Sequence, residues 1–402
     1  MATTTGRQLS ILYLITFINL VGFGIVLPVF PFFGNLVGAS PAETTLAMAA
    51  YSLGQFVGAP LWGKLSDRYG RRPVLLFSLV GAIAAYLIMA HASDIWTLGG
   101  SRLFGGLMAG NIAAAFAYVG DISTPETRPK AMGMIGAAFG LGFIFGPAIG
   151  GLIAGSNPDF NDFAIVGYVS AAFAGIAAIG TWWLLPESLT AERRAQARRD
   201  QSAIGPGDVL RAKPVIGGLI ILSLLVISGA ALMETTLAFF AHDVFGWGPS
   251  QVGLTFAAVG IISAALQGGA AGPLNRRFGS AALVVAGVAA HALGLAMMAA
   301  AQSPWLFIAG LAVLAVGLGL FNPAFQTLAS AQTDDGDRGM VMGLTQGASS
   351  LGRVIGPAVS GSIYVGIARH APFAIGAGVM VIALATAMIV ASRGRAPQGA
   401  AA

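Results

Sequence analysis

Two titratable side chains within long apolar segments are the first candidates for proton chemistry. Glu234 lies within the segment 214–240, and His291 lies within 281–300. An ionised carboxylate in hydrocarbon costs free energy, so burial favours the protonated form of Glu234, and protonation there can accompany a change of state. The alternative for Glu234 is a place near the outer mouth, where it is solvated or paired. A histidine titrates near physiological pH, but on an apolar helix it is more often a packing residue.

A second group of charges lies in the sequence GKLSDRYGRRP at 63–73, which joins two apolar segments. Its two glycines permit a tight turn, and Pro73 suits the first turn of the following helix. Asp67 and Arg71 are fixed charges beside the membrane that can pair with other helices. The alternative is a solvated basic turn that only sets the topology.

These charges are exceptional because the rest of the chain is apolar. Of 402 residues, 56% are hydrophobic and 9% are charged, whereas soluble proteins carry about 25% charged residues. So few charges cannot cover a soluble surface, and most of the surface must face lipid. The chain has no cysteine, which excludes disulfides, thiolate metal sites and cysteine nucleophiles. The net charge of +5 comes from short loops and predicts a topology signal, with no nucleic-acid partner.

Twelve apolar segments have the length of about 20 residues that a membrane-spanning helix needs. They lie near 11–33, 44–62, 73–91, 95–119, 131–153, 163–185, 214–240, 251–271, 281–300, 304–330, 339–365 and 372–392. Only 186–213 is long and polar, so we predict an N-terminal six-helix bundle at 1–185, a cytoplasmic linker, and a C-terminal six-helix bundle at 214–402. Most of the 21 Lys and Arg residues fall on one side, which places both termini and the linker in the cytoplasm.

The two halves of the chain repeat each other. Residues 63–70 align with 272–279, and residues 141–148 align with 351–358 at nearly the same spacing. Agreement between two unrelated stretches indicates a duplication. Each copy carries an even number of helices, so both enter the membrane in the same orientation. The predicted fold class is therefore an all-α membrane protein, with twelve transmembrane helices in two pseudo-symmetric six-helix bundles.

The loop at 63–73 resembles the first signature motif of the major facilitator superfamily. This resemblance implies that Asp67 lies near the N-terminus of helix 11 and that Arg71 lies near Asp121 at the end of helix 4, where such contacts latch the cytoplasmic side shut. Arg102, in helix 4, resembles a second motif in which an arginine reaches into the bundle. The alternative is that Arg102 snorkels to the outer surface.

Helix 5 contains the sequence GFIFGPAIGG at 142–151, which resembles the motif of twelve-span drug:proton antiporters. Its glycines, four residues apart, form a flat face for close helix packing, and its proline introduces a kink. The motif residues are Gly142, Gly146, Pro147, Gly150 and Gly151. The alternative is ordinary tight packing with no directional meaning.

Helices 2 and 3 look very like those of the tetracycline-type efflux carriers, and the resemblance runs weakly along nearly the whole chain. Those carriers have acidic groups where this sequence has Asn19, Ala85 and His291, and a histidine where it has Ser263. Their charged substrate and proton site is therefore not reproduced here, and metal–tetracycline exchange is not predicted.

Polar residues within the spans are candidates for lining a substrate cavity, or for hydrogen bonds between helices. They are Asn19, Gln55, Asn111, Gln267, Asn322, Gln326 and Gln346. We predict proton-coupled efflux of lipophilic drugs or similar small molecules by alternating access. The alternatives are an exporter of an endogenous metabolite, such as a sugar or amino-acid derivative, and a membrane-embedded enzyme.

An enzyme is disfavoured because the sequence has no HExxH motif, nucleophile elbow, P-loop or metal-spaced His/Cys cluster. We therefore expect no cofactor and no metal site. The expected partners are a small-molecule substrate, protons and the lipid bilayer. The expected state is a monomer in a bacterial cytoplasmic (inner) membrane, crossing it many times.

Overall fold

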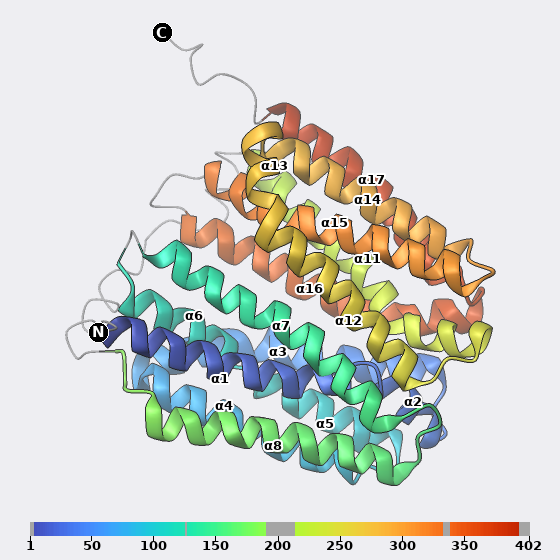
Figure 1. Ribbon diagram of the computed structural model, residues 1–402, viewed down its shortest axis with the longest axis horizontal. Helices are drawn as coiled ribbons and strands as arrows, with labels where there is room; N and C mark the ends of the chain where they lie inside the picture. Colours follow the sequence, from blue (N-terminus) through green and yellow to red (C-terminus); the bar gives the residue numbers. More distant parts are fainter. Residues whose placement is uncertain (1–3, 125–126, 190–213, 333–337, 394–402) are drawn as a thin grey trace. The chain divides into compact units, whose positions relative to one another are not determined.

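The computed structural model describes residues 4–124, 127–189, 214–332 and 338–393 (Figure 1). Every regular element in these ranges is a helix. The chain divides into two compact units: Met1–Ser202 with Ala241–Gly260, and Ala203–Phe240 with Ile261–Ala402. Residues 190–213, which make up most of the predicted linker, lie outside the described residues. The predicted division into two six-helix bundles remains a prediction.

Eight helices come from the N-terminal half of the chain. They are α1 (Thr4–Val26), α2 (Phe30–Leu36), α3 (Pro41–Tyr69), α4 (Arg71–Ala90), α5 (Ile95–Leu107), α6 (Asn111–Ile122), α7 (Arg128–Ala154) and α8 (Phe160–Leu184). Within this unit α1 packs against α7 and α8, α4 packs against α8, and α3 packs against α5 (Figure 1).

The remaining elements follow the linker. They are α11 (Pro214–Phe245), α12 (Pro249–Ala265), the π-helix η1 (Leu266–Ala270), α13 (Ala271–Phe278), α14 (Ser280–Ala299), α15 (Pro304–Ala331), α16 (Arg338–Gly366) and α17 (Ala371–Arg393). Here α14 packs against α15 and α17. The last residues of α11 and most of α12 belong to the first unit.

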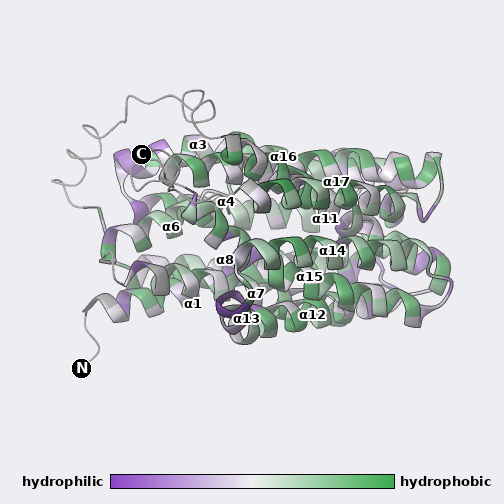
Figure 2. Cartoon of the chain, turned by 90° about the horizontal axis from the view of Figure 1, so that it is seen from above, coloured by the Kyte–Doolittle hydropathy of each residue, from purple (hydrophilic) through white to green (hydrophobic). Residues whose placement is uncertain are grey.

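Among the described residues, 10 helical stretches are long and apolar enough to cross a membrane. Figure 2 shows hydrophobic residues along the helices, whereas α13 is markedly hydrophilic. Two further helices, α3 and α16, are each 29 residues long but more polar than those 10 stretches. The predicted count of twelve requires both as spans. A span that lines a watery cavity tolerates more polar residues than one surrounded by lipid.

Helix starts are fixed by local sequence. Ser40 and Glu43 form a capping box at the start of α3, and Ser303 caps α15. At the start of α5, the Asp94 carboxylate accepts hydrogen bonds from the Thr97 backbone N–H (2.8 Å) and hydroxyl (2.7 Å). These bonds to the ionised form hold the pKa of Asp94 below its ordinary value.

The fourth predicted span, near 95–119, was expected to be one continuous helix, but the structure divides it into α5 and α6. The span is present as Ile95–Ile122, but it is interrupted between α5 and α6. The Ser78 hydroxyl donates to the Met108 carbonyl oxygen and accepts from the Asn111 N–H at 2.8 Å. The Trp62 Nε1–H donates to the Leu107 carbonyl oxygen at 2.5 Å. Side chains of other helices thus satisfy the backbone groups that the interruption frees.

Candidate functional site

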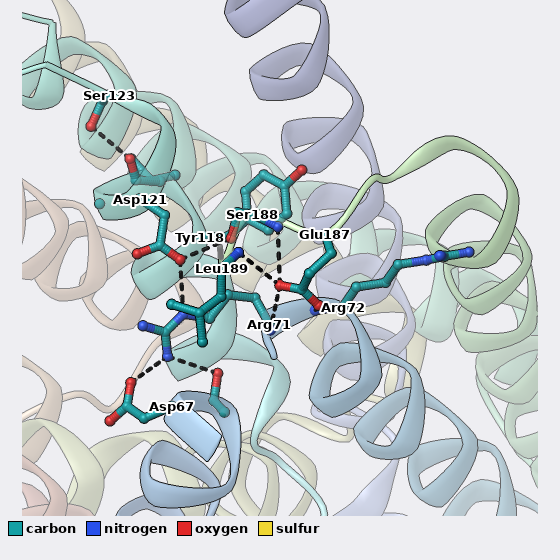
Figure 3. A network of polar contacts seen from close by, with 12 residues as sticks. Asp67, Arg71, Arg72, Tyr118, Asp121, Ser123, Glu187, Ser188 and Leu189 are labelled. Carbon is teal, nitrogen blue, oxygen red and sulfur yellow. Dashed lines mark hydrogen bonds and ion pairs between the residues drawn. The ribbon is translucent and has the colours of Figure 1, made fainter. Parts of the chain in front are cut away.

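A network of charges joins α3, α4 and α6 in the first unit (Figure 3). The Arg71 Nε lies 2.9 Å from Asp121 Oδ2, and its Nη1 lies 2.5 Å from Asp67 Oδ1 and 3.1 Å from Ser66 Oγ. Arg71 is 8% exposed, whereas the Asp67 side chain is 58% exposed. The expected pairing of Arg71 with Asp121 is present. Arg71 is therefore a buried centre that bridges two carboxylates on different helices.

A carboxylate from a distant part of the chain caps the start of α4. Gly70, which precedes α4, has φ +116° and provides no side-chain cap. The Glu187 Oε1 accepts from the Arg71 N–H at 2.9 Å, and its Oε2 accepts from the Arg72 N–H at 3.1 Å. Oε1 also accepts from the Ser188 and Leu189 N–H groups, both at 3.0 Å. Glu187 thus satisfies free N–H groups at a helix start, where a negative charge is favourable.

The segment that carries Glu187 is fastened to the same network. The Ser188 hydroxyl donates to Asp121 Oδ2 at 2.8 Å, and the Tyr118 hydroxyl donates to the Pro186 carbonyl oxygen at 2.8 Å. Glu187 and Ser188 were not among the sequence candidates. The only signal was an acidic residue directly after a proline at the end of a span. The chain leaving α8 is therefore held against both α4 and α6.

We expect Gly70→Ala to destabilise the protein more than Gly279→Ala does. Both glycines have positive φ, +116° and +82°, so either alanine is strained by about 1–2 kcal/mol. A Cβ at Gly70 would also lie 2.3 Å from Glu187 Oε2, whereas a Cβ at Gly279 meets nothing within 4 Å. Disrupting the Glu187 cap adds about 1–3 kcal/mol. Thermal unfolding of the two purified variants measures the difference, and equal losses would show that the cap contributes nothing.

Arg102 lies inside the first unit instead of reaching the surface. It is 8% exposed, and its Cζ lies 4.6 Å from the Tyr51 ring centroid, 5.4 Å from that of Phe30 and 6.0 Å from that of Phe23. Three aromatic faces therefore stabilise the guanidinium by cation–π contact. This geometry agrees with an arginine that reaches into the bundle and not with snorkelling.

The glycine motif of α7 forms two close helix contacts. A Cβ at Gly142 would lie 2.6 Å from Leu20 Cβ, one at Gly146 would lie 2.6 Å from Gly24 Cα, and one at Gly150 would lie 1.9 Å from the carbonyl oxygen of Ile25. These three glycines seat α7 on α1. Gly151 instead faces the start of α12 in the same unit, where a Cβ would lie 2.5 Å from the Pro249 carbonyl oxygen. Pro147 lies inside α7 between these contacts.

In the second unit, Glu234 of α11 has a basic partner in α16. The Glu234 Oε2 lies 3.7 Å from Arg353 Nη1, and the two side chains are 37% and 45% exposed. Arg353 lies about 20 Å from either end of α16, and Glu234 lies about 16 Å from the end of α11 at Phe245, at 1.5 Å per residue. Both charges are therefore away from the helix ends, and Glu234 is paired.

The family model for the Major Facilitator Superfamily matches residues 12–271 and 249–401. The chain belongs to the major facilitator superfamily. It is 33% identical over 350 residues to the tetracycline resistance protein, class C, of Escherichia coli, covering 86% of this chain and 87% of the relative. It is 28% identical over 377 residues to multidrug resistance protein 2 of Bacillus subtilis (strain 168), covering 93% and 92%.

Solved structures show the same fold. The crystal structure of the human organic anion transporter MFSD10 (TETRAN) superimposes with a TM-score of 0.72 at 24% identity, covering 96% of this chain and 99% of that one. By its family and its tetracycline resistance relatives, the chain is a major facilitator transporter, a multi-pass protein of the inner membrane, and not an enzyme. Its resemblance to the tetracycline-efflux branch is confirmed.

His291 of this major facilitator chain lies in the packed interior of the second unit. It is 0% exposed, and a Cβ at Gly317 would lie 2.8 Å from the backbone nitrogen of His291. Among the described residues, neither ring nitrogen has a hydrogen-bond partner. The tight contact of α14 with α15 therefore surrounds His291. Its role in proton coupling remains a prediction, and Glu234 is the more accessible group.

The cavity candidates differ in exposure. Asn19 and Asn111 line one small cavity of about 10 Å³ in the first unit, which has room for about one water molecule. The Asn111 Oδ1 accepts from the Ile112 N–H at 2.9 Å, and Gln55 is half-buried. In the second unit the corresponding candidates are exposed: Gln267, Asn322 and Gln326. That these side chains line one substrate chamber remains a prediction, as does the approach of Asp67 to the eleventh predicted span, 339–365.

Proposed function

We propose that this transporter exports lipophilic drugs or similar small molecules in exchange for protons, by alternating access. The observation that carries the proposal is the extent of similarity to tetracycline resistance proteins, 33% over 86% of the chain for the class C protein. A second relative is named for multidrug resistance. The substrate is a small molecule, and we propose that the protein works as a monomer.

Glu234 is the proposed proton carrier. When ionised, its carboxylate lies 3.7 Å from the Arg353 guanidinium and forms a neutral pair with it. Protonation removes the attraction and leaves one charge in place of a neutral pair. Such a local change in charge is the kind of event that biases a two-state element. The partial exposure of both side chains gives a proton access to the carboxylate.

The network around Arg71 is the proposed cytoplasmic latch. Arg71 holds Asp67 and Asp121, and Asp121 in turn holds Ser188. Because Asp67 is the exposed member, its carboxylate is free to engage another element in one state and release it in another. Arg102, Pro147 and the motif glycines support the helices that move; these glycines are Gly142, Gly146, Gly150 and Gly151. The alternative to drug export is export of one endogenous metabolite.

A panel of unrelated toxic compounds distinguishes these functions. The chain is expressed in a bacterial host that lacks its own efflux pumps, beside an Asp67→Ala variant and an empty vector. A drug exporter protects against several unrelated lipophilic compounds, whereas a metabolite exporter protects against one class at most. We expect broad protection from the wild type and its loss in Asp67→Ala at equal expression. Protection confined to a single chemical class would favour the metabolite exporter.

A further inference from the structure

The contact between α11 and α16 holds the backbone around Glu234 and Arg353 closely. A Cβ at Gly352 would lie 2.9 Å from the carbonyl oxygen of Leu224, and one at Gly356 would lie 2.5 Å from Ala231 Cβ. Glycines four residues apart on α16 thus form a flat face against α11. Arg353 follows the first of them, and Glu234 lies one turn beyond Ala231. The close packing therefore fixes the backbone positions from which the two charged side chains extend.

Hydrogen bonds between the two helices lie on both sides of the charged pair. The Ser223 hydroxyl donates to the Thr345 carbonyl oxygen at 3.0 Å and lies 2.6 Å from the Ser349 hydroxyl. Further along, the Thr235 hydroxyl lies 2.9 Å from the Ser360 hydroxyl. These bonds hold the helices together without help from the ion pair. The ion pair is therefore not needed to hold α11 against α16.

The charged groups are loosely held. Their separation of 3.7 Å exceeds hydrogen-bond distance, and within the described part of the chain the Arg353 guanidinium makes no other polar contact. An arginine has five donors in a fork that matches a carboxylate. Ser350 and Gln346, one and two turns earlier on α16, lie on the same helix face, and Gln346 is exposed. Both signs of charge are thus accessible with unused bonding capacity.

Pairing offsets the cost of two charges within a span only in part when their remaining donors and acceptors have no hydrogen-bond partner. A cation alone would satisfy Glu234 and leave Arg353 unpaired, and an anion alone would do the reverse. A molecule carrying both charges satisfies both residues and leaves the local net charge unchanged. Its ammonium also requires the ionised form of Glu234, so that bound substrate and bound proton exclude one another. That exclusion is what exchange transport needs.

We propose that Glu234 and Arg353 form a binding site for zwitterionic substrates, with Glu234 receiving an ammonium group and Arg353 a carboxylate or similar acidic group. This inference rests on the proposed export function and specifies its substrate class. In the ion pair, each residue occupies the place of the opposite charge of the substrate. The lipophilic remainder of the substrate lies against the apolar helix surfaces.

Three fluorescent probes that share one lipophilic group test the proposal. They are Nε-dansyl-lysine, which is zwitterionic; its methyl ester, which is cationic; and its Nα-acetyl derivative, which is anionic. Binding to the purified full-length protein is measured by the change in dansyl fluorescence. We expect the wild type to bind the zwitterion about tenfold more tightly than either derivative, since each derivative loses one charge-assisted contact.

If each charged residue binds one charged group of the probe, the two single variants should give reciprocal results. In Arg353→Gln the zwitterion and the methyl ester bind equally, because the carboxylate no longer has a partner. In Glu234→Gln the zwitterion and the acetyl derivative bind equally. The double variant removes both charges together and serves if a single variant misfolds; it is expected to bind all three probes alike. Ser362→Ala, an exposed change on α16, is the control and keeps the wild-type order.

The outcomes separate this inference from the proposed function. Wild type that binds the ester or the acetyl derivative as tightly as the zwitterion overturns the inference, and so does a lack of binding of all three probes. Equal loss of all probes in both single variants would show that the pair is only structural. Broad protection in the compound panel together with any of these results leaves export intact. Loss of broad protection alongside the reciprocal pattern would instead overturn the export proposal.

Discussion

Replacing Glu234 by Gln is expected to abolish proton-driven accumulation of substrate, while downhill movement continues at substrate concentrations high enough to offset the weaker binding. A gradient of one pH unit supplies about 1.4 kcal/mol per proton, which corresponds to about tenfold accumulation. Gln keeps the size and polarity of the side chain but carries no exchangeable charge. The variant can therefore still change conformation with substrate bound, but it cannot couple that change to a proton.

The measurement compares uphill and downhill transport in proteoliposomes, using the compound that gives most protection in the panel. Asp243→Asn is the matched control, since Asp243 is an exposed acidic residue at the end of the same helix. The control is expected to accumulate substrate as the wild type does. Full uphill transport by Glu234→Gln would rule out Glu234 as the proton carrier.

Among single glycine-to-alanine changes in α7, Gly150→Ala is expected to lower the stability of the protein most. The added Cβ would lie 1.9 Å from the carbonyl oxygen of Ile25, far inside contact distance, so α1 and α7 must separate. Overpacking of this kind costs about 1–3 kcal/mol. Because the contact extends through Gly146 and Gly142, the separation also loosens neighbouring packing.

Gly140→Ala in the same helix is the control for this change. A Cβ at Gly140 meets nothing within 4 Å, and alanine is the better helix former by up to about 1 kcal/mol. Thermal unfolding of the purified proteins should show a lower midpoint for Gly150→Ala and an unchanged or higher one for Gly140→Ala. If both variants unfold like the wild type, the α1–α7 contact does not need its glycines.

The helical membrane fold could be predicted because bilayer thickness fixes the length of an apolar span. The same reasoning singled out Glu234 as a charge within a span, whereas the pairing of Arg71 with Asp121 was implied by the resemblance to the first signature motif. It did not predict the interruption between α5 and α6, which depends on Ser78 and Trp62 from other helices. A periodicity within one segment carries no information about such distant hydrogen bonds.

The partners of the charged residues were harder to predict than the residues themselves. Arg353 lies within the predicted span 339–365, but its approach to Glu234 depends on how α16 packs against α11. The Gly352 and Gly356 spacing was visible in the repeat and indicates a close contact. It does not say which helix makes that contact. Glu187 was missed for the same reason, since its cap on α4 joins residues far apart in the sequence.

Proton release on substrate addition tests the central claim most directly. Wild-type protein is reconstituted in proteoliposomes with a pH-sensitive dye inside and a pH gradient across the membrane. The substrate is added to the compartment with the lower proton concentration. As substrate accumulates in the other compartment, protons should move into the compartment to which substrate was added. An ionophore that collapses the pH gradient should stop both substrate accumulation and proton movement. Accumulation that persists unchanged without a pH gradient, or substrate movement with no proton movement, would contradict proton-coupled export.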